Sequence, residues 1–142
     1  MNTLQQANEF VVYFTRWASA RTDILAVALV GSHARNAARE DSDVDLVIIT
    51  DDPQKYLAHT EWIGTFGIVA RQQVEDYGKL TSLRVWYESE LEIEYGFTTP
   101  AWAQTPLDEG TREVIDDGMQ ILFEREALLS PHGVCHTDRT IR

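Results

Sequence analysis

The chain has 142 residues and 44% of them are hydrophobic, which is enough for one substantial core and too little for two ordinary domains. Its net charge of −11, from 23 acidic and 12 basic residues, argues against nucleic acid as the main partner, because phosphate backbones require a basic surface. A single cysteine, a polar start and the absence of any apolar run near the roughly 18 residues of a membrane span lead us to expect a cytoplasmic protein of one domain, residues 1 to 142, without a membrane segment.

An amphipathic helix of about 16 residues is predicted at the N-terminus. Thr3 and Gln6 have the spacing of a capping box, and apolar residues recur at helical intervals from Leu4 to Ala18. This apolar stripe predicts that the helix covers one face of a sheet.

A glycine and a serine follow the first predicted strand, an unbroken apolar run over residues 24 to 30. Gly31 has no side chain to hold a ligand away from the backbone, and Ser32 is placed to cap a short helix over residues 33 to 38. The free amide groups at the start of such a helix attract anions. Taken alone, this pair is more often an ordinary turn between strand and helix.

Two carboxylates stand at the start of the second predicted strand, which continues to Ile49. Asp43 and Asp45 are one residue apart, so both side chains lie on one face, with α-carbons roughly 6.5 to 7 Å apart. Such a pair suits Mg²⁺, which prefers oxygen ligands and often shares them with substrate phosphates. A solvated acidic turn is the alternative, but the apolar residues between and after the acids favour a metal site.

The rest of the chain alternates between helix and strand signals. A helix is predicted from Pro53 toward Trp62, followed by a strand at residues 68 to 74. Alternation over residues 83 to 97 predicts two strands joined by a tight turn at residues 88 to 90.

The last of these strands carries Glu90, Glu92 and Glu94 on one face. A short helix at residues 108 to 116 and a strand at residues 119 to 123 complete the predicted fold. Residues 130 to 142 are expected to form a flexible tail.

The motif of Gly31 and Ser32, ten further residues, and then Asp43 and Asp45 resembles that of the nucleotidyltransferase superfamily of the DNA polymerase beta type. The likeness is greatest to its small bacterial members and covers about residues 24 to 50. It implies an α/β (α+β) fold, namely a mixed, twisted sheet of about five strands with helices packed on it.

The resemblance also implies a reaction and its residues. In this superfamily a third carboxylate on a neighbouring strand completes the metal site or acts as general base. We prefer Glu94 to Glu92 for this role, because it is nearer the centre of its strand. An acceptor hydroxyl would attack the α-phosphorus of a nucleoside triphosphate, expected to be ATP, with Mg²⁺ as cofactor and pyrophosphate as leaving group. Ser32, beside Gly31, would bind the triphosphate, with charge supplied by Arg35.

The acceptor stays open at this point. An acidic protein attracts cations, which suggests a small molecule such as an aminoglycoside, bound in a site that a homodimer would complete. One alternative is a protein partner, as in the minimal nucleotidyltransferase antitoxins that modify a toxin. Another is a nucleotide-binding module that regulates a partner without turnover, although the intact acids favour catalysis.

Overall fold

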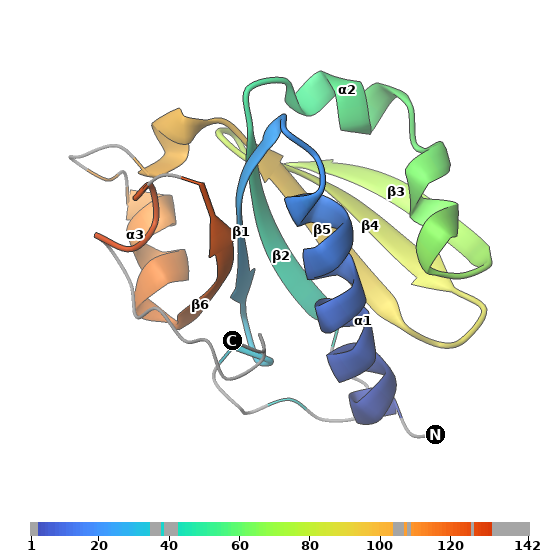
Figure 1. Cartoon of the computed structure of the whole chain (residues 1–142). Coiled ribbons are helices and arrows are strands. Elements are labelled where there is room, and N and C mark those ends of the chain that lie inside the picture. The colour runs from blue at the N-terminus through green and yellow to red at the C-terminus, as the bar shows by residue number, and fades with distance from the viewer. Residues whose placement is uncertain are drawn as a thin grey trace.

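Six strands form one mixed sheet, with helices on both of its faces, in the computed structural model of the chain (Figure 1). The structure describes residues 3–34, 38, 43–103, 107, 109–125 and 127–131. The strands are β1 (Ile24–Val30), β2 (Val44–Thr50), β3 (Val69–Asp76), β4 (Thr81–Tyr87), β5 (Glu92–Thr98) and β6 (Met119–Glu124). The predicted fold class is confirmed, but the sheet has six strands where about five were expected. β3, which was predicted at residues 68 to 74, is mostly exposed and pairs along its length with β4.

The strands lie in the order β3-β4-β5-β2-β1-β6. β2 and β5 are parallel, and the four other neighbouring pairs are antiparallel. A parallel pair needs a long crossover connection, which the chain between β2 and β5 provides. This crossover brings residues 45 and 94, far apart in the sequence, to the same level of adjacent strands.

The helices agree with the sequence pattern except in the crossover. The α-helices are α1 (Thr3–Ser19), α2 (Pro53–Ala58) and α3 (Glu109–Asp116), and the 3-10 helices are η1 (Glu61–Phe66) and η2 (Pro100–Ala103). The single helix predicted from Pro53 is therefore two shorter ones, because the backbone is extended at His59. Among the described residues, no helix is both long and apolar enough to cross a membrane.

Two clusters of buried side chains hold the helices to the sheet. On one face, Phe14 of α1 packs against Tyr95 of β5 with a ring-centroid distance of 5.5 Å. On the other face, Trp102 of η2 joins a cluster with Val47 and Ile49 of β2. β1 and β2 are buried on both sides, which explains their continuous apolar runs. Each fully buried side chain of this kind contributes about 1.5 to 3 kcal/mol to folding.

One arginine joins the end of β6 to the segment between α1 and β1. Arg125 Nε donates a hydrogen bond to the carbonyl oxygen of Ile24 at 2.9 Å. Its Nη2 donates to the carbonyl oxygens of Ser19 and Arg21 at 2.8 and 2.7 Å. The side chain therefore satisfies carbonyl groups at the end of α1, in the segment after it and at the start of β1.

We expect Arg125→Ala to lower the free energy of unfolding by roughly 1 to 3 kcal/mol, because three carbonyl groups lose a charged donor. Denaturant unfolding followed by circular dichroism would measure the change. Arg112→Ala, at an exposed position of α3, is the control and should change stability by less than about 0.5 kcal/mol. Equal effects of the two substitutions would contradict the role given to Arg125.

Candidate active site

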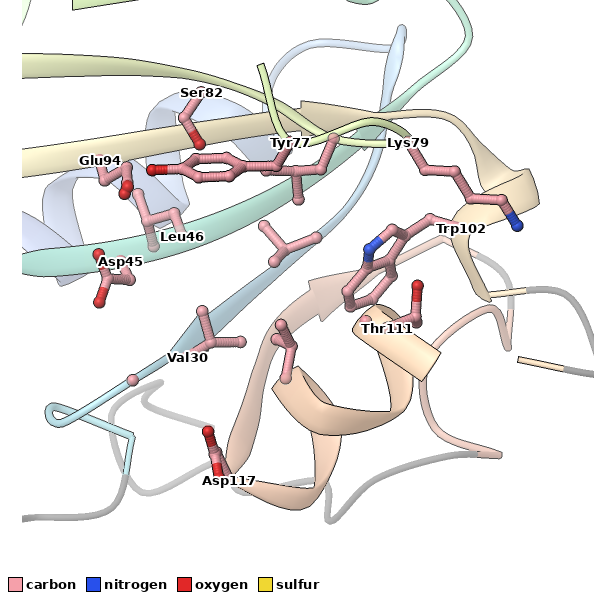
Figure 2. Close-up of a pocket in the computed structure, with 15 residues that line it drawn as sticks. Val30, Asp45, Leu46, Tyr77, Lys79, Ser82, Glu94, Trp102, Thr111 and Asp117 are labelled. Carbon is pink, nitrogen blue, oxygen red and sulfur yellow. The ribbon is translucent and has the colours of Figure 1, made fainter. Parts of the chain in front are cut away.

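The acidic residues singled out in the sequence lie where β1 ends and β2 begins. Asp45 is opposite Val30 of β1 on one side and opposite Glu94 of β5 on the other. All three residues line one cavity, and Figure 2 shows the Asp45 and Glu94 side chains near each other at one end of it. The site is thus built on three adjacent strands at the centre of the sheet.

Three carboxylates converge at this position. One oxygen atom from each of Asp43, Asp45 and Glu94 lies within 4.8 Å of the others, and all three residues are half-buried. Glu92 accepts a hydrogen bond from Arg84 instead, with a distance of 2.9 Å. The prediction that placed Glu90 on the strand face is wrong, because Glu90 lies in the turn before β5 with φ of 76°.

Gly31 is required by its backbone and by its neighbour. Its φ is +75°, a conformation that residues with a side chain rarely adopt. A Cβ atom at this position would lie 2.4 Å from Asp45 Oδ2. A residue other than glycine would therefore strain the turn and displace one of the three carboxylates.

The turn after Gly31 is described for three further residues. Ser32 is half-buried in it, and the Ala34 backbone N–H donates to the Gly31 carbonyl oxygen at 3.1 Å. Residues 33 and 34 belong to this turn, and residues 35 to 37 of the predicted short helix lie outside the described residues. Arg35 therefore has no described position, and the same holds for the predicted tail from residue 132 onward.

The electrostatic environment disfavours three charged carboxylates. Burial, together with the nearby charges of Asp43 and Glu94, raises the pKa of Asp45 to about 8. Burial also raises the pKa of Glu94, although the Arg84 guanidinium acts in the opposite direction. The cluster therefore has more negative charge than its surroundings stabilise, a condition that a bound cation would relieve.

Arg84 of β4 is a residue of the site that the sequence analysis missed. Its Nη2 donates to Glu94 Oε1 and Oε2 at 3.2 and 3.3 Å and lies 3.9 Å from Asp43 Oδ2. Burial lowers the pKa of Arg84, but Glu94 and the other nearby carboxylates raise it more, so the group stays charged. The hairpin pattern would have found it, because a turn centred on Ser89 places residue 84 opposite residue 94.

A cavity of about 400 Å³ extends from the carboxylates toward η2 and α3 (Figure 2). Asp45 and Glu94 lie at one end and Trp102 lies farther along (Figure 2), and Val114 is another apolar residue of the lining. Tyr77, at the start of the β3–β4 turn, also lines the cavity and is 58% exposed. The cavity thus combines an anionic end with apolar walls, as small-molecule sites commonly do.

Comparison with known proteins identifies the fold and the family. Residues 15–99 match the sequence profile of the family described as nucleotidyltransferase domain. Among solved structures, the chain is similar to the crystal structure of an aminoglycoside 6-adenyltransferase from Bacillus subtilis, with a TM-score of 0.61 and 14% identity. The match covers 85% of this chain but 41% of that one, and at this identity it shows the fold alone. No curated protein sequence matches the chain.

The profile match covers more than half of the chain, from within α1 to the residue after β5. It includes the turn at Gly31, both aspartates and Glu94. The predicted resemblance to the nucleotidyltransferase superfamily is confirmed. The chain belongs to the nucleotidyltransferase domain family.

Proposed function

We propose that this chain transfers a nucleoside monophosphate from a nucleoside triphosphate, in the first instance ATP, to a hydroxyl group of a small-molecule acceptor. The reaction would depend on Mg²⁺ and release pyrophosphate. The observation that carries the proposal is the convergence of Asp43, Asp45 and Glu94 beside the turn that begins at Gly31. Family membership supports the reaction class, and the following points support the finer assignment.

The three carboxylates suit a divalent cation by their chemistry. They offer oxygen ligands, which Mg²⁺ prefers, and they form an incomplete set that substrate phosphates would complete. The raised pKa of Asp45 fits the same interpretation, because a bound cation would favour the charged form. Bound Mg²⁺ would supply charge stabilisation for the reacting oxygen atoms and the leaving pyrophosphate.

The residues of the chain would then have separate tasks. Asp43 and Asp45 would hold the metal, and Glu94, the third carboxylate at the site, would either complete the metal site or accept the proton of the attacking hydroxyl. The backbone at Gly31 would let the triphosphate approach, and the Ser32 hydroxyl would donate to a phosphate oxygen. Arg35 is assigned to the triphosphate from the sequence motif alone.

The acceptor we propose is a cationic molecule that carries hydroxyl groups. The net charge of −11 and the carboxylates at one end of the cavity would attract a cation, and the apolar wall would contact a ring. The similar solved structure is described as an aminoglycoside 6-adenyltransferase, which is consistent with this class of acceptor. A second copy of the chain would complete the open side of the cavity.

A protein acceptor is the second candidate. One large side chain with apolar surface is exposed at the cavity, Tyr77 of the turn after β3, which is 58% exposed. Exposed apolar groups next to a reaction site are suited to contact with another protein. A target of this kind would replace the small molecule without changing the roles of the three carboxylates.

The proposed transfer can be tested with ATP labelled in the α-phosphate. We expect Mg²⁺-dependent transfer of label to an aminoglycoside mixture, and at least a roughly 100-fold lower rate for Asp45→Asn, because a metal ligand is lost. Asp51→Asn, an exposed neighbour just after β2, is the matched control and should keep the native rate.

The same reaction distinguishes the two acceptors. Label on a co-purified protein, seen as a nucleotide-sized mass increase, would replace the small-molecule proposal with the protein one. ATP binding to the native chain without transfer to either acceptor would favour a regulatory module. A native rate in Asp45→Asn would refute the metal assignment.

Stability should depend on pH through Asp45. Its pKa is about 8 in the folded chain against 3.8 for a free carboxyl, so the metal-free protein loses stability as the pH rises through this range. Asp45→Asn lacks this carboxyl, so its free energy of unfolding should exceed that of the native chain more at pH 8 than at pH 5. The difference between the two pH values should be at least about 1 kcal/mol. Thermal melts in EDTA would measure the gain. A gain that is the same at both pH values would show that the charge of Asp45 is not the cause.

Replacement of Gly31 by alanine should disrupt both stability and activity. The added Cβ atom meets Asp45 Oδ2 and the backbone has φ of +75°, so we expect a loss of roughly 1 to 3 kcal/mol and at least a 100-fold lower transfer rate. Chemical unfolding and the labelled-ATP assay would measure the two effects.

Two other glycines separate the contributions. Gly78 has φ of +86° and no atom near the position of an added Cβ, so Gly78→Ala should lower stability without lowering the transfer rate. Gly64 has open space around it, so Gly64→Ala should resemble the native chain. An activity of Gly31→Ala equal to that of Gly78→Ala would contradict the close-contact argument.

A further inference from the structure

Arg84 is the cation at the centre of the acidic site. Its guanidinium contacts Glu94 and Glu92 by hydrogen bonds and approaches Glu75 to 3.3 Å and Asp43 to 3.9 Å. Four carboxylates therefore surround one positive charge, and Asp45 lies beside them. This arrangement is more specific than charge balance requires, because each part of the guanidinium faces a different carboxylate.

We propose that Arg84 is a positioning residue for Glu94. It holds this carboxylate where it can accept the proton of the attacking hydroxyl group, and it prevents the carboxylate from binding the first divalent cation. Asp43 and Asp45 bind that cation. The inference rests on the function proposed above. It gives the third carboxylate one of the two roles that remained open for it, proton acceptor instead of metal ligand.

The contacts of Glu94 support this division. Both of its oxygen atoms lie within hydrogen-bonding distance of Arg84 Nη2, at 3.2 and 3.3 Å. Its side chain is 13% exposed, against 30% for Asp43, so it has less freedom to turn toward another ligand. Each carboxylate oxygen has a second lone pair, which leaves Glu94 able to accept a proton while it is held.

Arg84 is itself fixed on the side away from Glu94. Nη1 donates to Glu92 at 2.9 Å, Nε lies 3.3 Å from Glu75 without forming a hydrogen bond, and the guanidinium carbon is 5.9 Å from the Trp86 ring centre. These contacts come from three strands, β3, β4 and β5. A lysine would keep the charge, but its single ammonium group cannot reproduce the planar, multi-sided contact.

The proposal has a consequence for metal binding that does not require the acceptor. Removal of Arg84 takes a positive charge away from the aspartates and frees Glu94 to ligate the cation. Metal affinity should therefore rise when Arg84 is lost, and Glu94 should contribute more to it than in the native chain. A purely structural arginine would also raise metal affinity through the loss of its charge, but it would leave the contribution of Glu94 to metal binding unchanged.

A double-mutant cycle with Mn²⁺ as the probe tests this consequence. Calorimetric titration would compare the native chain, Arg84→Gln, Glu94→Gln and the double variant, all without nucleotide. We expect Arg84→Gln to bind Mn²⁺ about tenfold more tightly, from charge alone. Glu94→Gln should weaken binding at least about threefold more in the Arg84→Gln background than in the native one. Equal losses in the two backgrounds, or weaker binding by Arg84→Gln, would overturn the proposal.

Two further variants keep the result interpretable. Arg71→Gln removes an arginine that packs over the same Trp86 ring, at 3.9 Å, and should leave Mn²⁺ affinity at the native value. Arg84→Lys serves if Arg84→Gln does not fold, and it should show the same sign of coupling with Glu94→Gln. Equal Mn²⁺ affinities of the native chain and Asp45→Asn would instead refute the proposed metal site, so the two failures are distinguishable.

Discussion

The parallel pairing of β2 with β5 is the constraint on which the site depends. It places Asp45 directly beside Glu94, although like charges on neighbouring strands normally destabilise a sheet. The pairing persists because the same strands bury apolar side chains on both faces, among them Ile48 and Phe97 at register partners. Core packing thus holds together carboxylates that would separate in water, and the resulting excess of negative charge is what suits the site to a cation.

Arg84 shows how the sheet manages this charge. The antiparallel pairing of β4 with β5 puts Arg84 opposite Glu94, while β3 brings Glu75 from the far side. One guanidinium therefore neutralises part of the acidic surface, with Nη2 in contact with Glu94 and 3.9 Å from Asp43 Oδ2. Carboxylates that are only partly neutralised are less stable than carboxylates that are fully paired. Such a loss of stability is expected at functional sites.

The two faces of the sheet differ in a way that makes the cavity possible. Helices α1 and α2 lie over one face of the sheet (Figure 1). A cluster of aromatic and aliphatic side chains, including Phe14 and Tyr95, fills the space between these helices and the sheet. On the opposite face, η2 and α3 pack over β1, β2 and β6, and Asp45 and Glu94 line the remaining cavity (Figure 2). The closed face supplies stability, and the other face leaves a cavity beside the strands.

The local elements and the motif could be predicted from the sequence. Apolar runs and capping signals located α1, β1 and β2, and the spacing of Gly31 and Asp45 identified the family, because these signals depend on neighbouring residues. Tertiary structure decided which glutamate meets the aspartates, since β2 and β5 are joined by about 40 residues and their register is set by packing. It also decided the contacts of Arg84, which depend on strands that approach each other through the folded sheet.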